Sequence, residues 1–262
     1  MFLNSNSDQW LILESVDSTN SYALAQKQLA SGTVILAKEQ TSGRGRMGRE
    51  WKSTAGNSFL FSGILNLNLN ELPLERISFI PLLTGLAAVK ACRSFFVNDS
   101  LKKFSVKWPN DVYMESEGHC GKLGGVLIES EQIDEALIRC VIGVGLNWKG
   151  RVSEVSDAEI QPASLFSYTE MDRFDFAPPL IREFNQLMEL LAINPVNILS
   201  EIRTCFYLDQ KLVKISDKIF RVTGINDRGS LLIVSPEDGS EREISSISEK
   251  IIPLTESEEV MQ

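Results

Sequence analysis

Three segments with the composition of β-strands follow one another in the middle of the chain, separated only by polar turns. They cover residues 104–114 (FSVKWPNDVYM), 121–130 (GKLGGVLIES) and 136–148 (ALIRCVIGVGLNW). Runs of β-branched and apolar residues bounded by turn-forming residues are typical of strands. The sequence therefore predicts three successive strands here.

Strands and helices are also expected on both sides of these segments. Strands are predicted at 10–16, 33–40, 57–68 and helices at 21–30, about 76–96, 177–191, 195–206. Residues 17–20 (DSTN) offer side chains that cap the first of these helices. The helix at 76–96 carries Pro81 near its first turns, where a missing N–H costs least. Its apolar face consists of Leu82, Leu83, Leu86 and Val89.

The residue pattern of the sequence changes at about residue 207. Short strand-like segments follow at 210–215, 218–225 and 229–235, separated by turn-forming residues such as NDRG and PEDG. We therefore predict two domains, a body at 1–206 and a small β-barrel at 207–262.

Charge and composition exclude several classes of protein. The formal net charge is −9 and the isoelectric point is near 4.9, which argues against general binding to DNA or RNA and against docking on anionic membranes. The longest apolar run, between Arg76 and Lys90, has 13 residues and is too short to span a bilayer. No secretory signal is visible at the N-terminus. We expect a cytoplasmic protein.

The chain contains one histidine, His119, and four cysteines in scattered positions without a CxxC motif. The cysteines are interpreted as reduced, structural thiols, and no metal site is predicted. A histidine-based hydrolase triad would depend on His119, which lies in a turn-like stretch. An enzyme of this composition would act through positioning and through Lys, Arg and Asp side chains.

Residues 39–52 (EQTSGRGRMGREWK) form a basic loop in this acidic chain. Between Gly43 and Lys52 there are four cations and one acid, a net charge of +3. Glycines allow tight folding with backbone N–H groups directed at a ligand, and arginines suit phosphate. The loop could hold a nucleotide phosphate, with Trp51 covering a ring. A solvated flexible loop and an RNA-binding RG segment are the alternatives.

Three further motifs each allow a structural and a functional interpretation. In KWPNDV (107–112), Pro109 removes a ladder donor, and the pair Asn-Asp either forms a turn or faces a site. In GKLGG (121–125), Lys122 is costly on an apolar strand unless it is paired, and the glycines indicate a bulge or the close approach of a ligand. The strand at 141–148 (VIGVGLNW) carries glycines and Asn147, and alone it indicates little.

The order of these motifs is more specific than any one of them. DSTN, the Gly/Arg loop, KWPND, GKLGG, GVGLN and a final small β domain together resemble the biotin–protein ligases over residues 12–255. The resemblance implies an α+β fold, in which a mixed sheet is packed with helices as in class II aminoacyl-tRNA synthetases, followed by an SH3-like barrel. Related proteins with an N-terminal DNA-binding domain are repressors. Because a strand begins by residue 10, we expect a ligase without repressor activity.

The resemblance also implies a reaction in two steps. Biotin and ATP, with Mg²⁺, give biotinyl-5′-AMP, and the biotinyl group then passes to a lysine of a biotin carboxyl carrier protein of acetyl-CoA carboxylase or a related carboxylase. The implied catalytic residues are Lys122, which would bridge the biotin carboxylate and the phosphate, Arg44 and Arg46, which would order the loop, and Asp111, which would serve the second step. Monomers and homodimers both occur in the family.

The implied binding residues follow from the same motifs. Biotin would contact Ser18, Thr19, Asn20, Gln40, Gly43, Arg44, Gly45, Arg46, Lys122, Gly124 and Gly125. ATP would contact Arg44, Arg46, Arg49, Trp51, Asn110, Lys122 and Asn147. Three rival interpretations stay open: a lipoate–protein ligase with the same fold and adenylate chemistry, a non-enzymatic RNA- or protein-binding module built on the RG loop, and a biotin sensor without activity.

Overall fold

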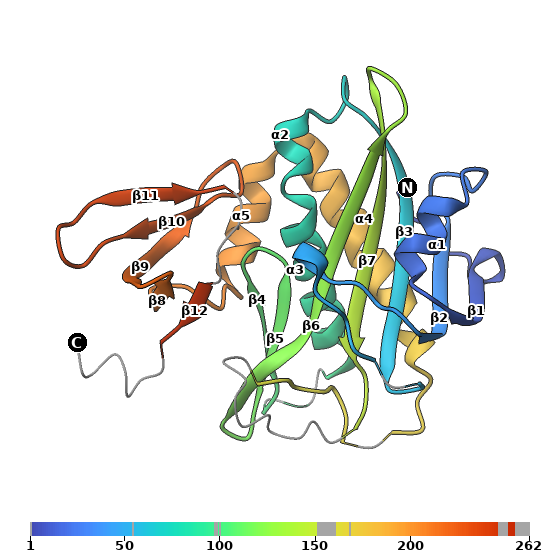
Figure 1. Ribbon diagram of the computed structural model, residues 1–262, viewed down its shortest axis with the longest axis horizontal. Helices are drawn as coiled ribbons and strands as arrows, with labels where there is room; N and C mark the ends of the chain where they lie inside the picture. The colour runs from blue at the N-terminus through green and yellow to red at the C-terminus, as the bar shows by residue number, and fades with distance from the viewer. Residues whose placement is uncertain are drawn as a thin grey trace.

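The computed structural model describes residues 2–53, 55–96, 99, 101–150, 161–167, 169–245 and 251–254. Its larger sheet has seven strands in the order β1-β2-β3-β7-β6-β5-β4 (Figure 1). These are β1 (Leu11–Val16), β2 (Val34–Gln40), β3 (Ser58–Asn68), β7 (Leu137–Asn147), β6 (His119–Gln132), β5 (Asp111–Ser116) and β4 (Lys103–Lys107). Strands β1 and β2 are parallel and the other pairs are antiparallel, so the sheet is mixed.

The smaller sheet has five antiparallel strands in the order β11-β10-β9-β8-β12. These are β8 (Leu212–Ile215), β9 (Lys218–Ile225), β10 (Leu231–Val234), β11 (Glu241–Ile244) and β12 (Ile251–Pro253). The α-helices are α1 (Thr19–Ala25), α2 (Leu74–Ile77), α3 (Ile80–Phe95), α4 (Ala177–Ile193) and α5 (Pro195–Arg203), and the 3₁₀ helices are η1 (Ser7–Gln9), η2 (Arg46–Gly48) and η3 (Arg173–Phe176). The predicted α+β fold with a small C-terminal β unit is confirmed.

The segment 104–114 is two strands and not one. Strands β4 and β5 pair as a hairpin with Val106 opposite Val112 and Lys107 opposite Asp111. The turn contains Pro109, joined to Trp108 by a cis peptide bond. Proline lacks a ladder donor, and its ring fixes φ, so a continuous strand is interrupted at this point. The hairpin brings Asn110 and Asp111 to one end of the sheet.

Helix α1 is shorter than the sequence predicted, because it ends at Ala25 and not near residue 30. The carbonyl oxygens of Gln26 and Leu29 accept hydrogen bonds of 3.1 and 3.0 Å from the buried guanidinium of Arg139 on β7. These bonds satisfy the carbonyls that follow the helix, where no further helical turn could do so. The chain after α1 is thereby fixed to the sheet.

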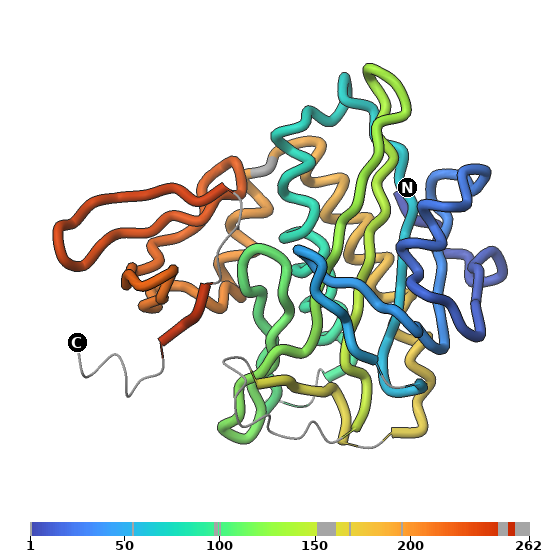
Figure 2. The backbone as a smooth tube through the Cα atoms, in the orientation of Figure 1, coloured from blue at the N-terminus to red at the C-terminus, as the bar shows by residue number. Residues whose placement is uncertain are grey.

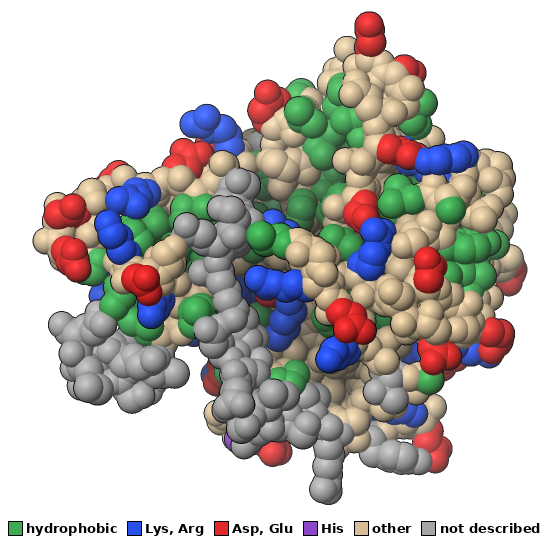
Figure 3. All heavy atoms as spheres, in the orientation of Figure 1, with side chains coloured by type: hydrophobic (Ala, Val, Ile, Leu, Met, Phe, Trp, Pro, Cys, Tyr) green, Lys and Arg blue, Asp and Glu red, His purple; other side chains and the backbone are tan. Residues whose placement is uncertain are grey.

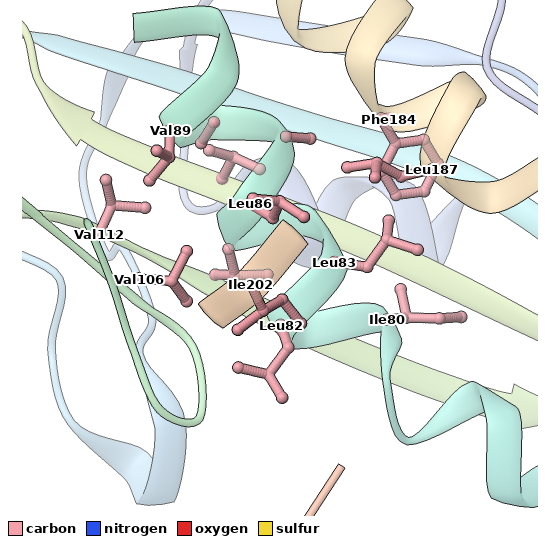
Figure 4. Close-up of a cluster of buried hydrophobic side chains, with 14 of the residues drawn as sticks. Ile80, Leu82, Leu83, Leu86, Val89, Val106, Val112, Phe184, Leu187 and Ile202 are labelled. Carbon is pink, nitrogen blue, oxygen red and sulfur yellow. The ribbon is translucent and has the colours of Figure 1, made fainter. Parts of the chain in front are cut away.

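The two faces of the large sheet have different functions in the fold. One face packs on α3 and α4 and forms the main core, part of which appears in Figure 4. The predicted apolar face of α3 is buried there. On the opposite face α1 covers only a small cluster, which consists of Ala23, Ile35, Ile64 and Val141. The rest of this second face is free for a site.

The helical stretch Leu74–Phe95 has the length and apolar composition of a membrane-spanning helix, and among the described residues it is the one such stretch. Because 67% of its most apolar window is buried inside the protein, it serves as the central helix of the core. This stretch is longer than the 13-residue apolar run of the sequence because it includes Glu75, Arg76, Lys90 and Arg93 near its ends.

The smaller sheet shares its core with the larger one. Val213, Phe220, Leu231 and Ile251 belong to the same continuous cluster as the residues of α3. Trp108 in the β4–β5 turn donates a hydrogen bond of 2.9 Å from Nε1 to the carbonyl oxygen of Gly229. The division at residues 206 and 207 stays a prediction, and residues 246–250 and 255–262 of the second unit lie outside the described part.

Candidate active site

A cavity opens on the face of the large sheet that α1 covers only in part. Its walls come from the start of α1, the loop after β2, the β4–β5 hairpin, and strands β6, β7 and β12. Figure 3 shows Lys and Arg side chains near the middle of this face, although the chain as a whole is acidic. The predicted site residues that line it are Ser18, Thr19, Asn20, Gln40, Arg44, Gly45, Arg46, Arg49, Trp51, Asn110, Asp111, Lys122 and Gly125.

The Gly/Arg loop is folded as a small hairpin over the sheet. Gly45 donates to the carbonyl of Arg49 at 2.7 Å, and Trp51 donates to the carbonyl of Gly43 at 2.9 Å. Met47 at its tip adopts φ 56°, a left-handed conformation that is uncommon for a residue other than glycine. Figure 2 shows this blue segment crossing in front of the green strands β6 and β7. The loop therefore forms one wall of the cavity.

Lys122 and Arg46 are held by oxygen atoms of the β4–β5 hairpin. Lys122 Nζ lies 2.7 Å from Asp111 Oδ1, and their strands β6 and β5 are adjacent. Arg46 donates from Nη1 to Asn110 Oδ1 at 3.2 Å. Burial lowers the pKa of Arg46, and Asp111 opposes this shift, so the guanidinium keeps its charge at neutral pH. An anion entering the cavity would meet both cations together.

A chain of buried polar side chains forms the other end of the cavity. The amide N–H and Oγ1 of Thr19 both donate to Gln40 Oε1, at 2.8 and 2.9 Å. Ser62 Oγ lies 2.8 Å from Thr19 Oγ1 and 2.6 Å from Asn20 Oδ1. Ser18 caps α1 by accepting from the N–H of Ser21. Buried polar groups of this kind suit a ligand that carries its own donors and acceptors.

Two glycines of β7 make room for the functional side chains above them. A Cβ added to Gly143 would lie 2.5 Å from Asn20 Oδ1, and one added to Gly145 would lie 2.9 Å from Trp51 Cε2. Any larger residue would displace the amide or the indole. Trp51 Nε1 is buried and has no hydrogen-bond partner among the described residues. The glycines that the sequence analysis regarded as weak signals therefore form the floor of the cavity.

Three predicted residues do not line the cavity. A Cβ at Gly124 would lie 2.3 Å from the carbonyl oxygen of Gly145, so this glycine faces the neighbouring strand. Gly43 packs beneath the loop, where a Cβ would lie 2.5 Å from the carbonyl oxygen of Trp51. The side chain of Asn147 does not line the cavity, and its Nδ2 donates to the carbonyl of Ala163 at 2.9 Å. Gly43 and Asn147 support the walls, whereas Gly124 permits the close pairing of β6 and β7.

Several residues in and around the cavity were not predicted from the sequence. Lys107, Trp108 and Ile251 line its side toward the small sheet, and Lys107 Nζ donates to the carbonyl of Ile251 at 3.1 Å. Glu129 of β6 accepts hydrogen bonds from both Arg44 and Asn20. No sequence signal marked Glu129 or Ser62, because their partners are distant in the chain. Lys107 and Trp108 belong to KWPND and could have been included.

Comparison with known proteins places this arrangement in a family. The sequence model of the Biotin/lipoate A/B protein ligase family matches residues 12–147, which carry nearly all of the cavity. The chain belongs to this family. The family and the ligase class predicted from the order of the motifs are therefore confirmed.

Relatives in the ligase family extend the match beyond these residues. The bifunctional ligase/repressor BirA of Escherichia coli is 30% identical over 251 residues, covering 90% of this chain and 74% of that protein. A biotin–[acetyl-CoA-carboxylase] ligase of Paracoccus denitrificans is 36% identical over 147 residues, 53% of this chain and 54% of that one.

The biotin protein ligase of Aquifex aeolicus, solved in complex with biotin and ATP, superposes with a TM-score of 0.72. It is 24% identical and the match covers 94% of this chain and 99% of that chain. This likeness shows the fold, and it includes the small C-terminal sheet because nearly the whole of both chains is aligned.

Proposed function

We propose that this chain is an ATP-dependent biotin–protein ligase of the cytoplasm. It converts biotin and ATP into biotinyl-5′-AMP and pyrophosphate, and then transfers the biotinyl group to a lysine of a biotin carboxyl carrier protein of acetyl-CoA carboxylase. The observation that carries the proposal is the position of Lys122. Its ammonium group lines the same cavity as the polar chain of Thr19 and Asn20 and the arginines of the loop.

In the first step a carboxylate oxygen of biotin bonds to the α-phosphorus of ATP, and the bond to pyrophosphate breaks. Both reactants are anions, so the step needs cations between them. Lys122 serves this purpose, and Arg44 and Arg46 stabilise the phosphate from the loop. Ser18, Thr19, Asn20 and Gln40 hold the ureido ring, and Gly125 leaves space beside the ion pair. The loop also keeps water away from the mixed anhydride.

In the second step the amine of the carrier lysine attacks the biotinyl carbonyl, an amide bond forms and AMP leaves. The amine must lose a proton on the way. Asp111 lines the cavity and is the acid nearest to Lys122, so we assign it the role of proton acceptor or of orienting Lys122. Its side chain is 15% exposed, which leaves it reachable from the cavity.

The nucleotide would lie along the loop. Trp51 offers an aromatic face and a buried N–H to the adenine, while Arg49 and Asn110 line the same wall. Mg²⁺ would enter with the ATP phosphates. In the described part of the chain no group of three or more His, Cys, Asp or Glu side chains could hold a metal ion. Mg²⁺ in nucleotide sites is usually bound by substrate phosphates and water together with one or two carboxylates.

Lipoate is the main alternative substrate, because the family also includes lipoate ligases. Mass spectra of two acceptors decide between them: a biotin carboxyl carrier domain incubated with this protein, ATP, Mg²⁺ and biotin, and a lipoyl domain incubated with lipoate in place of biotin. We expect one biotinyl adduct that requires ATP. An adduct of lipoate on a lipoyl domain, with none of biotin, would replace the proposal.

Lys122→Ala supplies the enzymatic control. This variant should form no adenylate, while Lys38→Ala, which removes an exposed lysine paired with Glu14, should retain activity. Equal activity of both variants would contradict the role of Lys122. RNA binding by the loop would survive either change, so a protein that binds RNA and forms no adduct would be the binding module instead.

A further inference from the structure

Glu129 contacts both the Gly/Arg loop and the polar end of the cavity, and the proposed reaction assigns it no role. It lies on β6, two residues beyond Leu127, and both residues line the small recess beneath the Gly/Arg loop. One carboxylate oxygen, Oε2, accepts from Arg44 Nη2 at 2.7 Å and from Asn20 Nδ2 at 3.0 Å. The first donor belongs to the loop and the second to the polar end of the cavity. A single acid therefore connects the two halves of the site.

These contacts close a ring of polar contacts. From Glu129 the ring passes through Asn20, Ser62 and Thr19 to Gln40, at distances between 2.6 and 3.0 Å, and the single hydroxyl hydrogen of Ser62 serves either Asn20 Oδ1 or Thr19 Oγ1. Gln40 is the last residue of β2, and the loop that starts there returns to the ring at Arg44. The loop is thus fixed at its origin by Gln40 and four residues later by Glu129. Of the five side chains from Glu129 to Gln40, only Glu129 carries a formal charge.

The ring also fixes the orientation of the Asn20 amide. Its Nδ2 donates to Glu129 and to the carbonyl oxygen of Leu127, at 3.0 and 3.2 Å. Both hydrogens are therefore occupied, and the amide has only its oxygen to offer to a ligand. Glutamine at 129 would carry N–H donors of its own. The Asn20 amide could then turn its oxygen toward residue 129 and its N–H groups toward the ligand.

We propose that Glu129 is a positioning residue that sets both the Gly/Arg loop and the Asn20 amide for the reaction. The inference rests on the proposed function, because its readout is biotin and adenylate binding. The Arg44–Glu129 pair is partly exposed, with 24% of the Glu129 side chain accessible. A charged hydrogen bond in such a place contributes more than a neutral one, and its loss corresponds to about tenfold in affinity.

Glu129→Gln tests the proposal with little change in shape. We expect biotin, titrated calorimetrically into the whole protein, to bind about tenfold more weakly, and biotinyl-AMP formed in the site to dissociate about tenfold faster. Glu131→Gln is the matched control. It removes the same charge from the same strand, but its partners are Lys27 and Arg139, away from the cavity, so both quantities should be unchanged.

The coupling to Arg44 separates positioning from general stabilisation. Glu129→Gln introduced into an Arg44→Gln background should reduce adenylate retention by less than it does in the unsubstituted protein, because the Arg44 pair is already broken and only the contact with Asn20 is lost. Independent, multiplicative losses would overturn the proposal, as would wild-type binding and retention in Glu129→Gln, or slower release of the adenylate. Thermal unfolding of each variant reports any loss of fold. Absence of biotinylation by the unsubstituted protein would overturn the proposed function itself.

Discussion

Lys122 and Asp111 form an ion pair inside the cavity, with Nζ 2.7 Å from Oδ1. Their strands are neighbours, and the β4–β5 turn directs Asp111 toward the strand that carries Lys122. A phosphate or carboxylate can approach the ammonium group while the acid keeps it in place. This pairing explains how a lysine is tolerated at the centre of the sheet.

Asp111→Asn should impair transfer more than adenylation. An amide cannot accept the proton of the attacking amine, so we expect transfer to fall about 100-fold, while adenylate formation falls less than tenfold. Single-turnover measurements with preformed biotinyl-AMP and a carrier domain isolate the second step. Equal losses in the two steps would assign Asp111 to orienting Lys122 instead.

Gly143→Ala should weaken biotin binding. The added Cβ would lie 2.5 Å from Asn20 Oδ1, so the amide must move and its hydrogen bonds must lengthen or break. The loss of one buried hydrogen bond corresponds to about tenfold or more in affinity. Calorimetric titration with biotin in the absence of ATP measures it. Unchanged affinity would show that Asn20 does not contact the ligand.

Gly145→Ala should affect the nucleotide and spare biotin. Its Cβ would lie 2.9 Å from the indole of Trp51, and displacement of the ring should weaken ATP binding about tenfold, the scale of an aromatic stacking contact. The change is the same as at Gly143 and occurs two residues along the same strand, so each variant serves as the control of the other. Loss of biotin affinity in both would indicate general damage to the strand.

Trp108→Phe should reduce kcat as well as stability. It removes the hydrogen bond to the carbonyl of Gly229, which joins the small sheet to the turn that carries Asp111. The unfolding free energy should fall by about 1–3 kcal/mol.

Trp148→Phe is the control. It removes a comparable hydrogen bond to the carbonyl of Met171, away from the cavity, and should lower stability without changing kcat. An unchanged kcat in Trp108→Phe would deny the small sheet a part in catalysis. Deletion of that sheet would be a poorer test, because it shares the main core.

Alkylation should modify one cysteine of the folded protein. Cys92, Cys140 and Cys205 are buried, and Cys120 is exposed. Burial raises the pKa of all four thiols, to about 11 for Cys140, so access of the reagent and not thiolate content distinguishes Cys120 from the other three. Iodoacetamide at pH 8 should therefore give a single adduct at Cys120 by mass spectrometry, and four adducts in guanidinium. More than one adduct in the folded state would contradict the burial of these thiols.

Much of the fold could be predicted because local patterns coincide with the tertiary structure. Strands β2, β3 and β9 begin and end within about a residue of the predicted segments, since their alternation and turn residues are local properties. Helix α1 was overpredicted because its end depends on Arg139, which lies more than 100 residues away. The segment 104–114 was taken as one strand because its hairpin pairing is not a property of a single segment.

The candidate site divides in the same way. The sequence by itself determined the chemistry: the arginines of the loop, Lys122, Asp111 and the polar side chains at 18–20 are residue types in an order that identifies the family. Only the tertiary structure decided which of the two adjacent glycines, Gly124 or Gly125, faces the cavity. Adjacent residues of a strand point to opposite faces, and an irregular register between β5 and β6 near Val112 turns Gly125 toward the ion pair and Gly124 toward β7.

The contacts of Glu129 likewise could be identified only from the tertiary structure. Its partners Arg44 and Asn20 lie 85 and 109 residues away in sequence. Local spacing contains no information on a contact of that separation, because the pairing of β6 with β7 and the folding of the loop over the sheet create it. The sequence thus fixes which groups are available, and the packing of the strands fixes which of them meet.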